Sequence, residues 1–197
     1  ATDGSNNTHS ATATVTVVDN TDPVAVAQDI TVALDANGAA SITTADIDNG
    51  SSDNCSFTLA LDVTSFDCDD LGANTVTLTA TDGSNNTHSA TATVTVVDNT
   101  DPVAVAQDIT VALDANGAAS ITTADIDNGS SDNCSFTLAL DVTSFDCDDL
   151  GANTVTLTAT DGSNNTHSAT ATVTVVDNTD PVAVAQDITV ALDANGA

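Results

Sequence analysis

The chain has no lysine and no arginine, and all 29 of its acidic residues are aspartate. Its formal net charge is −29 at pH 7, and three histidines are the only weakly basic side chains. Salt bridges to lysine or arginine are therefore excluded, and counter-ions must offset the self-repulsion of the folded chain. Nucleic acid and anionic membrane surfaces are disfavoured as partners, because binding them needs lysine and arginine against phosphate. We also expect no direct membrane insertion of this segment.

Tryptophan, tyrosine and methionine are also missing, and phenylalanine occurs only four times. The core of each folding unit is therefore thin, and aromatic rings that stack on sugars are scarce. The residues that enzymatic chemistry usually needs are equally scarce, since there is no glutamate and no lysine. We therefore expect no enzymatic activity.

The chain repeats itself without change. The segment Ala1–Ser5 returns at Ala80 and again at Ala159, which sets a period of 79 residues. Such periodicity is typical of tandem arrays in which each repeat is one structural unit. Because the chain starts and stops within a repeat, we expect it to be a window of a longer array.

Proline marks the junctions between repeats, because it lacks the amide donor that a central strand needs. With Pro23 and Pro102 placed at junctions, the sequence predicts whole domains at 19–97 and 98–176. Residues 1–18 are then the last strands of a preceding repeat, and residues 177–197 are the first strands of a following one.

Period-two alternation within each repeat predicts short strands. Val76, Leu78 and Ala80 are expected to face inward, with the threonines between them outward, and 90–97 repeats this pattern. Segments 30–34 and 40–43 flank a turn with Asn-Gly, which predicts a hairpin. Segment 57–63 is a further strand, against which 66–68 is expected to pair, and no helix is predicted. These features predict an all-β fold of antiparallel sandwich repeats that form an extended fibre.

Two cysteines in each period indicate a disulfide and an oxidising, extracellular compartment. Their spacing of thirteen residues is too wide for a zinc or redox motif. The sequence therefore predicts the pairs Cys55–Cys68 and Cys134–Cys147. Each would add about 3 kcal/mol to stability by constraining the unfolded chain.

Three segments of the period resemble a hyalin-type (HYR) immunoglobulin-like repeat: 52–55 (SDNC), 71–86 (LGANTVTLTATDGSNN) and 94–98 (VTVVD). The similarity is strongest to repeats of giant surface adhesins of gliding Bacteroidetes. It implies an immunoglobulin-like sandwich, export to the cell surface and an adhesive or filamentous role. The sequence departs from many such repeats at Ala90 and Ala92, where a cysteine is common in the last strand.

Clustered carboxylates without cationic side chains are either solvated or bound to metal, and Ca²⁺ suits aspartate and backbone oxygens. One candidate cluster is the D-x-D-x-G loop with a following aspartate, and another is the acidic junction, to which the turn aspartate of the last hairpin adds a ligand. The calcium candidates over all copies are Asp19, Asp22, Asp46, Asp48, Asp53, Asp82, Asp98, Asp101, Asp125, Asp127, Asp132, Asp161, Asp177 and Asp180. For each cluster a solvated loop or linker is the alternative, and it is preferred for the acidic triplet around Cys68.

The function predicted from these features is that of a stalk or filament in a secreted or cell-surface adhesin, stiffened by calcium at the junctions and by disulfides within domains. Its partners would be neighbouring identical repeats, other copies of the fibre or a surface ligand. The alternative is a calcium-dependent module that grips glycans or ice through many weak sites.

Overall fold

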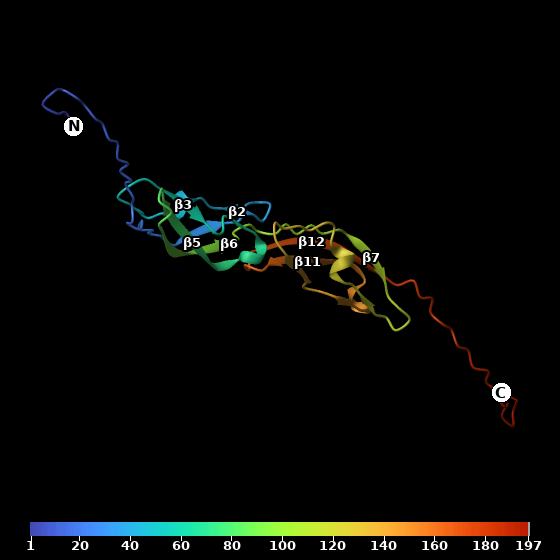
Figure 1. Ribbon diagram of the computed structural model, residues 1–197. Helices are drawn as coiled ribbons and strands as arrows, with labels where there is room; N and C mark the ends of the chain where they lie inside the picture. Colours follow the sequence, from blue (N-terminus) through green and yellow to red (C-terminus); the bar gives the residue numbers. More distant parts are fainter. Residues whose placement is uncertain (197) are drawn as a thin grey trace. The chain divides into compact units, whose positions relative to one another are not determined.

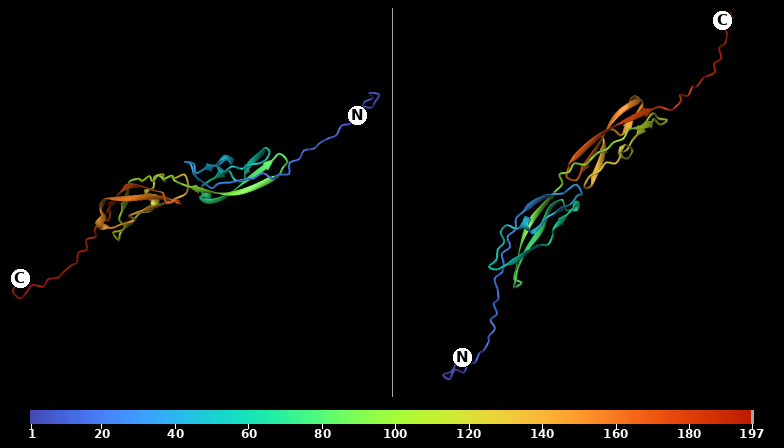
Figure 2. Two further views of the ribbon diagram at one scale, coloured as in Figure 1. Left: turned by 90° about the vertical axis from the view of Figure 1, so that its left-hand side faces the viewer. Right: turned by 90° about the horizontal axis from the view of Figure 1, so that it is seen from above.

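The computed structural model describes residues 1–196, which form two compact units that divide between Thr100 and Asp101. The division falls inside the acidic junction that follows Val97. Each unit holds one complete repeat and is all-β apart from single helical turns (Figures 1 and 2). No helix in the described part of the chain is long and apolar enough to cross a membrane.

The main sheet of the first repeat has the strand order β1-β6-β5-β3. Its centre is the long hairpin of β5 (Gly72–Asp82) and β6 (Thr87–Val97), which pair antiparallel from Gly72↔Val96 to Thr81↔Thr87. Strand β3 (Phe57–Leu61) is antiparallel to β5, whereas β1 (Ile30–Ala33) runs parallel to β6. The predicted antiparallel arrangement therefore has one exception in each repeat.

A second layer closes the sandwich. It contains the short pair β2 (Ala40–Ser41) and β4 (Ser65–Phe66), together with the helical turns α1 (Thr44–Ile47) and η1 (Cys68–Asp70). The segment after Pro23 lies along the 48–52 loop through isolated bridges at Val24↔Ser52 and Ala27↔Asp48.

The second repeat has the same architecture. Its main sheet has the order β7-β12-β11-β9, and its second layer pairs β10 with β8. The elements are β7 (Ile109–Ala112), β8 (Ala119–Ser120), α2 (Thr123–Ile126), β9 (Phe136–Leu140), β10 (Ser144–Phe145), η2 (Cys147–Asp149), β11 (Gly151–Asp161) and β12 (Thr166–Val176).

The core lies between the two layers and consists of aliphatic side chains with one phenylalanine. Val76, Leu78 and Ala80 of β5 are fully buried, which confirms the inward face predicted for this strand. The second layer contributes Ile47, fully buried at the end of α1, and Phe66. The cluster in the second repeat is Leu113, Ile121, Ile126, Phe145, Val155, Leu157, Ala171, Val173 and Val175.

Three local predictions were wrong. Residues 35–38 do form a turn, with the Gly38 amide bonded to the Asp35 carbonyl at 2.9 Å, but its arms β1 and β2 are not paired with each other. Strand β4 pairs with β2 and not with β3. The polar loop also contains α1, whose first turn is closed by Asp46. Strand partners far away in the sequence decided the first two outcomes, whereas α1 is closed locally by the contacts of Asp46 with Thr43.

The predicted disulfide pairings were also wrong. Cys55 and Cys147 are free thiols, whereas Cys68 and Cys134 are each disulfide-bonded. The reason is the length of β5. Cys55 lies just before Phe57, which pairs opposite Asp82, while Cys68 lies just before Gly72 at the other end of the 11-residue strand. A strand of this length spans about 33 Å, and a disulfide requires Cα atoms within about 7 Å.

Segments with strand-like sequence outside the two repeats do not form strands. Val15 and Val17 correspond to Val94 and Val96 of β6 by the period, yet they are 84% and 90% exposed. Residues 179–192 likewise contain no strand. The same residues that are buried when β5 lies beside them remain solvated without it, so the repeat and not the strand is the folding unit.

Because the core depends on a few aliphatic positions, truncating one in each repeat should be costly. We expect the double variant Leu78→Ala and Leu157→Ala to lose about 2–5 kcal/mol of unfolding free energy per repeat, measured by urea denaturation. The matched control, Val24→Ala with Val103→Ala, removes side chains that are 50% exposed. It should cost below about 1 kcal/mol. An equal loss in the two variants would contradict this placement of the core.

Hydrogen bonds from backbone amides and hydroxyls lower the pKa of several loop aspartates below their ordinary value of 3.8. The Thr77 amide lowers that of Asp62, the Thr43 side chain that of Asp46, and the Asn37 amide that of Asp35. Each depressed pKa contributes stability that is present above pH 3.8 and is lost as the pH falls through the folded-state pKa.

We therefore expect the melting temperature to fall as the pH is lowered below about 3.8. The variant Asp62→Asn should be less stable than the wild type at pH 7, and its stability should depend less on pH in this range. A wild-type melting temperature that is flat from pH 4 to pH 2.5 would contradict the role of these bonds.

Candidate metal centre

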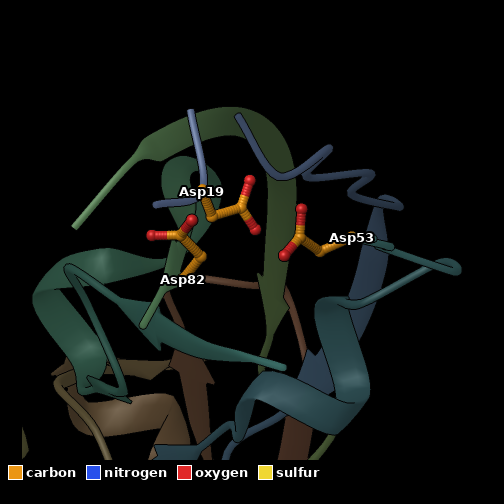
Figure 3. A group of neighbouring side chains, drawn as sticks. All are labelled: Asp19, Asp53 and Asp82. Atoms are coloured by element: carbon orange, nitrogen blue, oxygen red, sulfur yellow. The ribbon is translucent and has the colours of Figure 1, made fainter. Parts of the chain in front are cut away.

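Three aspartates from separate parts of the first repeat meet at one end of its sandwich. Asp19 precedes the junction proline, Asp53 lies in the loop before β3, and Asp82 is the last residue of β5 (Figure 3). One carboxylate oxygen from each lies within 4.8 Å of the others. We call this group the Asp82-end cluster.

Asp82 is held in place by the turn that follows it. One of its carboxylate oxygens accepts the amides of Ser84 at 2.9 Å and Asn86 at 2.7 Å, and the other accepts Asn86 Nδ2 at 2.8 Å. Asn85 adopts the left-handed conformation (φ 68°) that lets the turn close around this side chain. Asp82 is 6% exposed.

Asn86 also ties the junction to the turn. Its Nδ2 donates to the Asp19 carbonyl at 3.1 Å as well as to the Asp82 carboxylate. Asp19 accepts the Thr21 amide at 3.0 Å and Asn54 Nδ2 at 3.3 Å, both on Oδ1. The hydrogen bond from the Thr21 amide lowers the pKa of Asp19 most, and the side chains of Cys55 and Asn54 lower it further, so that Asp19 is ionised.

The cluster leaves buried carboxylate oxygens without a donor. Asp19 Oδ2 and Asp53 Oδ1 are both inaccessible to solvent and accept no hydrogen bond. The other oxygen of Asp53 accepts the Cys55 amide at 3.1 Å. A buried ionised oxygen without a partner is costly, and a bound cation removes that cost.

The second repeat repeats the arrangement with Asp98, Asp132 and Asp161, whose ligand atoms also lie within 4.8 Å of one another. Asp98 and Asp161 are 5% and 6% exposed, and Asp132 Oδ1 is buried without a hydrogen bond. Asp161 is held by the amides of Ser163 and Asn165, as Asp82 is held in the first repeat.

The donor set fits a hard divalent cation. Carboxylate oxygens are the ligands that Ca²⁺ prefers, at a flexible coordination number that backbone carbonyls and water complete. The side chains that would hold the cation are those of Asp19, Asp53 and Asp82.

Several of the predicted calcium ligands lie outside the two clusters. Among the described residues, no group of ligand atoms within 4.8 Å includes Asp46 or Asp48. Asp46 Oδ2 accepts the amide and hydroxyl of Thr43, and Asp48 Oδ1 accepts the Ser51 amide. Asp125 and Asp127 make the same contacts in the second repeat. Asp22, Asp101, Asp177 and Asp180 also lie outside these groups.

Two participants were not foreseen from the sequence. His88 lies in β6, and its Nδ1 accepts the Ala25 amide at 3.0 Å. It thereby fastens the segment after Pro23 to the main sheet. Cys55 borders the cluster, and the carboxylate of Asp19, by hydrogen bonding and by charge, raises the pKa of its thiol.

A second surface feature is a field of hydroxyls on the outer face of the main sheet. By register, β5 and β6 place Thr75 opposite Thr93, Thr77 opposite Thr91, and Thr79 opposite Ser89. The hydroxyls of Thr79 and Ser89 are 3.0 Å apart. This face contains no charged side chain along these pairs.

No family model matches the chain, and no curated protein matches it in sequence. Among solved structures, the chain resembles protocadherin gamma B7 extracellular cadherin domains 1–4, at 16% identity and a TM-score of 0.35, covering 82% of this chain and 52% of that one. Drosophila N-cadherin EC1-4 is 15% identical to the chain with a TM-score of 0.38, and the match covers 79% of this chain and 50% of that one. An endo-fucoidan hydrolase of glycoside hydrolase family 107 is 14% identical with a TM-score of 0.32, and the match covers 84% of this chain and 30% of that one.

The chain thus spans about half the length, or less, of these three proteins. At TM-scores this low the likeness carries no argument about function.

The contact between Cys55 and Asp19 has a measurable consequence. In a Cys147→Ser background, we expect Asp19→Asn to speed alkylation of Cys55 by iodoacetamide at pH 7, because it removes the carboxylate whose hydrogen bond and charge raise the pKa of the Cys55 thiol. The control Asp22→Asn removes a neighbouring charge outside the cluster and should leave the rate near that of the wild type. Equal rates in all three proteins would contradict the contact.

Proposed function

We propose that this chain is a structural segment, a stalk or filament, of a secreted or cell-surface repeat protein, and that calcium stiffens its junctions. The observation that carries the proposal is the Asp82-end cluster, which recurs in each repeat with buried, donorless carboxylate oxygens. A catalytic or ligand-specific site would not need to recur unchanged every 79 residues. A mechanical element gains from repetition, because each repeat contributes the same length and the same local geometry.

The position of the cluster supports a role at junctions. Asp19 and Asp98 lie in the segments through which the chain passes into a repeat, just before Pro23 and Pro102. Their cluster partners belong to the body of that repeat. A cation held by all three carboxylates would bind the incoming segment to the sandwich and restrict its direction.

An extracellular location is part of the proposal. It is supported by the disulfide-bonded cysteines, by the resemblance of 52–55 and 71–86 to hyalin-type repeats, and by the absence of lysine and arginine. Trypsin-like proteases have no cleavage site in such a chain. The millimolar calcium typical of extracellular fluids suits a site built from three carboxylates.

The hydroxyl field on β5 and β6 supports a second candidate, a module that holds a glycan or an ice surface by many weak contacts. Glycan-array binding and ice-recrystallisation assays on the protein separate the candidates. A spacer gives no signal in either assay, whereas a signal lost on replacing Thr77 and Thr91 by valine would favour the binding module.

Calcium titration tests the metal centre directly. We expect isothermal titration to give two equivalent Ca²⁺ sites per chain, one at each cluster. Saturating calcium at about 100 times the dissociation constant should add about 2.7 kcal/mol to stability. For a domain of this size, each 1 kcal/mol corresponds to about 4–8 °C in melting temperature.

Matched variants assign the sites. Asp53→Asn and Asp132→Asn should each remove one of the two sites, while Asp46→Asn, which alters a helix-capping residue outside the cluster, should retain both. Two sites that survive in the double variant Asp53→Asn and Asp132→Asn would show that calcium binds elsewhere. Zn²⁺ binding that depends on Cys55, without Ca²⁺ binding, would also overturn the proposal.

A further inference from the structure

Each repeat contains two asparagines that are followed directly by glycine, and the fold holds the two pairs differently. They are Asn37 and Asn49 in the first repeat and Asn116 and Asn128 in the second. An asparagine before glycine is open to deamidation, because glycine has no Cβ that obstructs attack of its backbone nitrogen on the asparagine side chain. Whether a given pair reacts then depends on the structure around it.

The pair that begins at Asn37 is held inside a closed turn. The buried Gly38 donates its amide to the Asp35 carbonyl at 2.9 Å, and Asp35 Oδ1 accepts the Asn37 amide at 2.8 Å. Gly117 is held by the Asp114 carbonyl in the same way, at 2.9 Å. The nitrogen that would attack is therefore already bonded, and the turn must open before this asparagine reacts.

The pair that begins at Asn49 lies instead in an exposed bulge. On one side, the Asn49 amide donates to the Val26 carbonyl at 2.9 Å. On the other side, Ser52 and Val24 exchange two backbone hydrogen bonds, at 2.7 and 2.9 Å. Gly50 lies between these anchors with φ at +90° and is exposed, as is Asn49. Among the described residues beyond its chain neighbours, none lies within 4 Å of the position that a Cβ would take.

The contact that the bulge glycine makes differs in kind from that of the turn glycine. The amide of Gly50 lies towards the Asp48 carboxylate, and that of Gly129 lies towards Asp127. A carboxylate can take up the amide proton as the nitrogen attacks, which a backbone carbonyl does not do. The bulge therefore presents an accessible nucleophile beside a base, and the turn does not.

We propose that Asn49 and Asn128 are sites of spontaneous deamidation, and that the product loosens the segment after each junction proline. The Gly50 nitrogen attacks Cγ of Asn49 and loses its proton, the Cγ–Nδ2 bond breaks, and ammonia leaves. Water then opens the succinimide ring at either carbonyl, which gives aspartate or isoaspartate with one new carboxylate. Water is the only co-reactant, and the reaction does not involve calcium.

Isoaspartate at position 49 would disturb the anchoring of the incoming segment. Its main chain runs through the former side chain and is longer by one methylene. The added length falls between the Asn49 amide, bonded to Val26, and Ser51, whose Oγ accepts the Val26 amide at 2.9 Å. The new carboxylate also lies next to Asp48 in a chain without lysine or arginine. Both bonds of Val26 are therefore weakened.

The first test compares the two pairs in one protein. The folded chain is incubated in chelator at pH 8.5 and 37 °C and then digested at aspartate, and isoaspartate is measured in peptides 48–52 and 35–45. Each peptide represents both repeats, because their sequences are identical. We expect isoaspartate to form roughly fivefold faster, or more, in peptide 48–52, the factor for opening one backbone hydrogen bond.

Unfolding in urea is the control, because it removes the difference in structure and should bring the two rates together. Equal rates in the folded protein would overturn the assignment of the site. A rate for peptide 48–52 that rises on unfolding as much as the rate for peptide 35–45 would overturn it as well.

The second test addresses the consequence. We expect the melting temperature of the wild type to fall during incubation and that of the double variant Asn49→Gln and Asn128→Gln to stay constant, because glutamine cyclises more slowly. The matched control, Asn37→Gln with Asn116→Gln, should age as the wild type does. Equal losses in the wild type and in the Asn49→Gln and Asn128→Gln protein would show that these sites do not loosen the segment.

Discussion

The hydrogen bond from a backbone amide to an aspartate carboxylate is the interaction on which this structure depends. Without lysine or arginine, each carboxylate must be satisfied by neutral donors, water or metal. Asp35, Asp62 and Asp82 accept amides from turns and from a neighbouring strand. Each bond closes a loop and stabilises the charge at once, which is why a chain of net charge −29 folds around so small an aliphatic core.

The same constraint explains why the Asp82-end cluster differs from the other acidic groups. Asp46 and Asp48 each accept hydrogen bonds on one carboxylate oxygen from a neighbour three residues away in the sequence. Asp19 and Asp53 come from distant segments, and each buries one oxygen for which the protein supplies no donor. The spacing of aspartates along the sequence does not distinguish these two cases, since they are closer together in the 46–50 loop than in the Asp82-end cluster. The distinction lies in whether a carboxylate oxygen is buried without a hydrogen-bond donor, as in Asp19 and Asp53.

Stability and assembly are separated along the repeat. The core and the amide-to-carboxylate bonds lie within one sandwich, whereas the acidic cluster and the cysteines lie at its two ends. The interactions that fold a repeat therefore lie within that repeat. The segments 10–18 and 179–192 illustrate the limit of this independence, because a strand sequence without the rest of its repeat remains solvated.

The sequence by itself determined the period, the all-β class and the inward face of β5, because alternation and exact repetition are local properties that burial follows directly. It also indicated Asp19, Asp53 and Asp82 as candidate ligands, although within two separate clusters. Only the tertiary structure decided that these three meet, that the arms of the 35–38 turn go to different strands, and that His88 accepts the Ala25 amide. The cysteines show the reason most clearly. Cys55 and Cys68 are thirteen residues apart in the sequence, but the chain between them crosses the sandwich. The two cysteines therefore lie near opposite ends of β5, separated by the length of that strand.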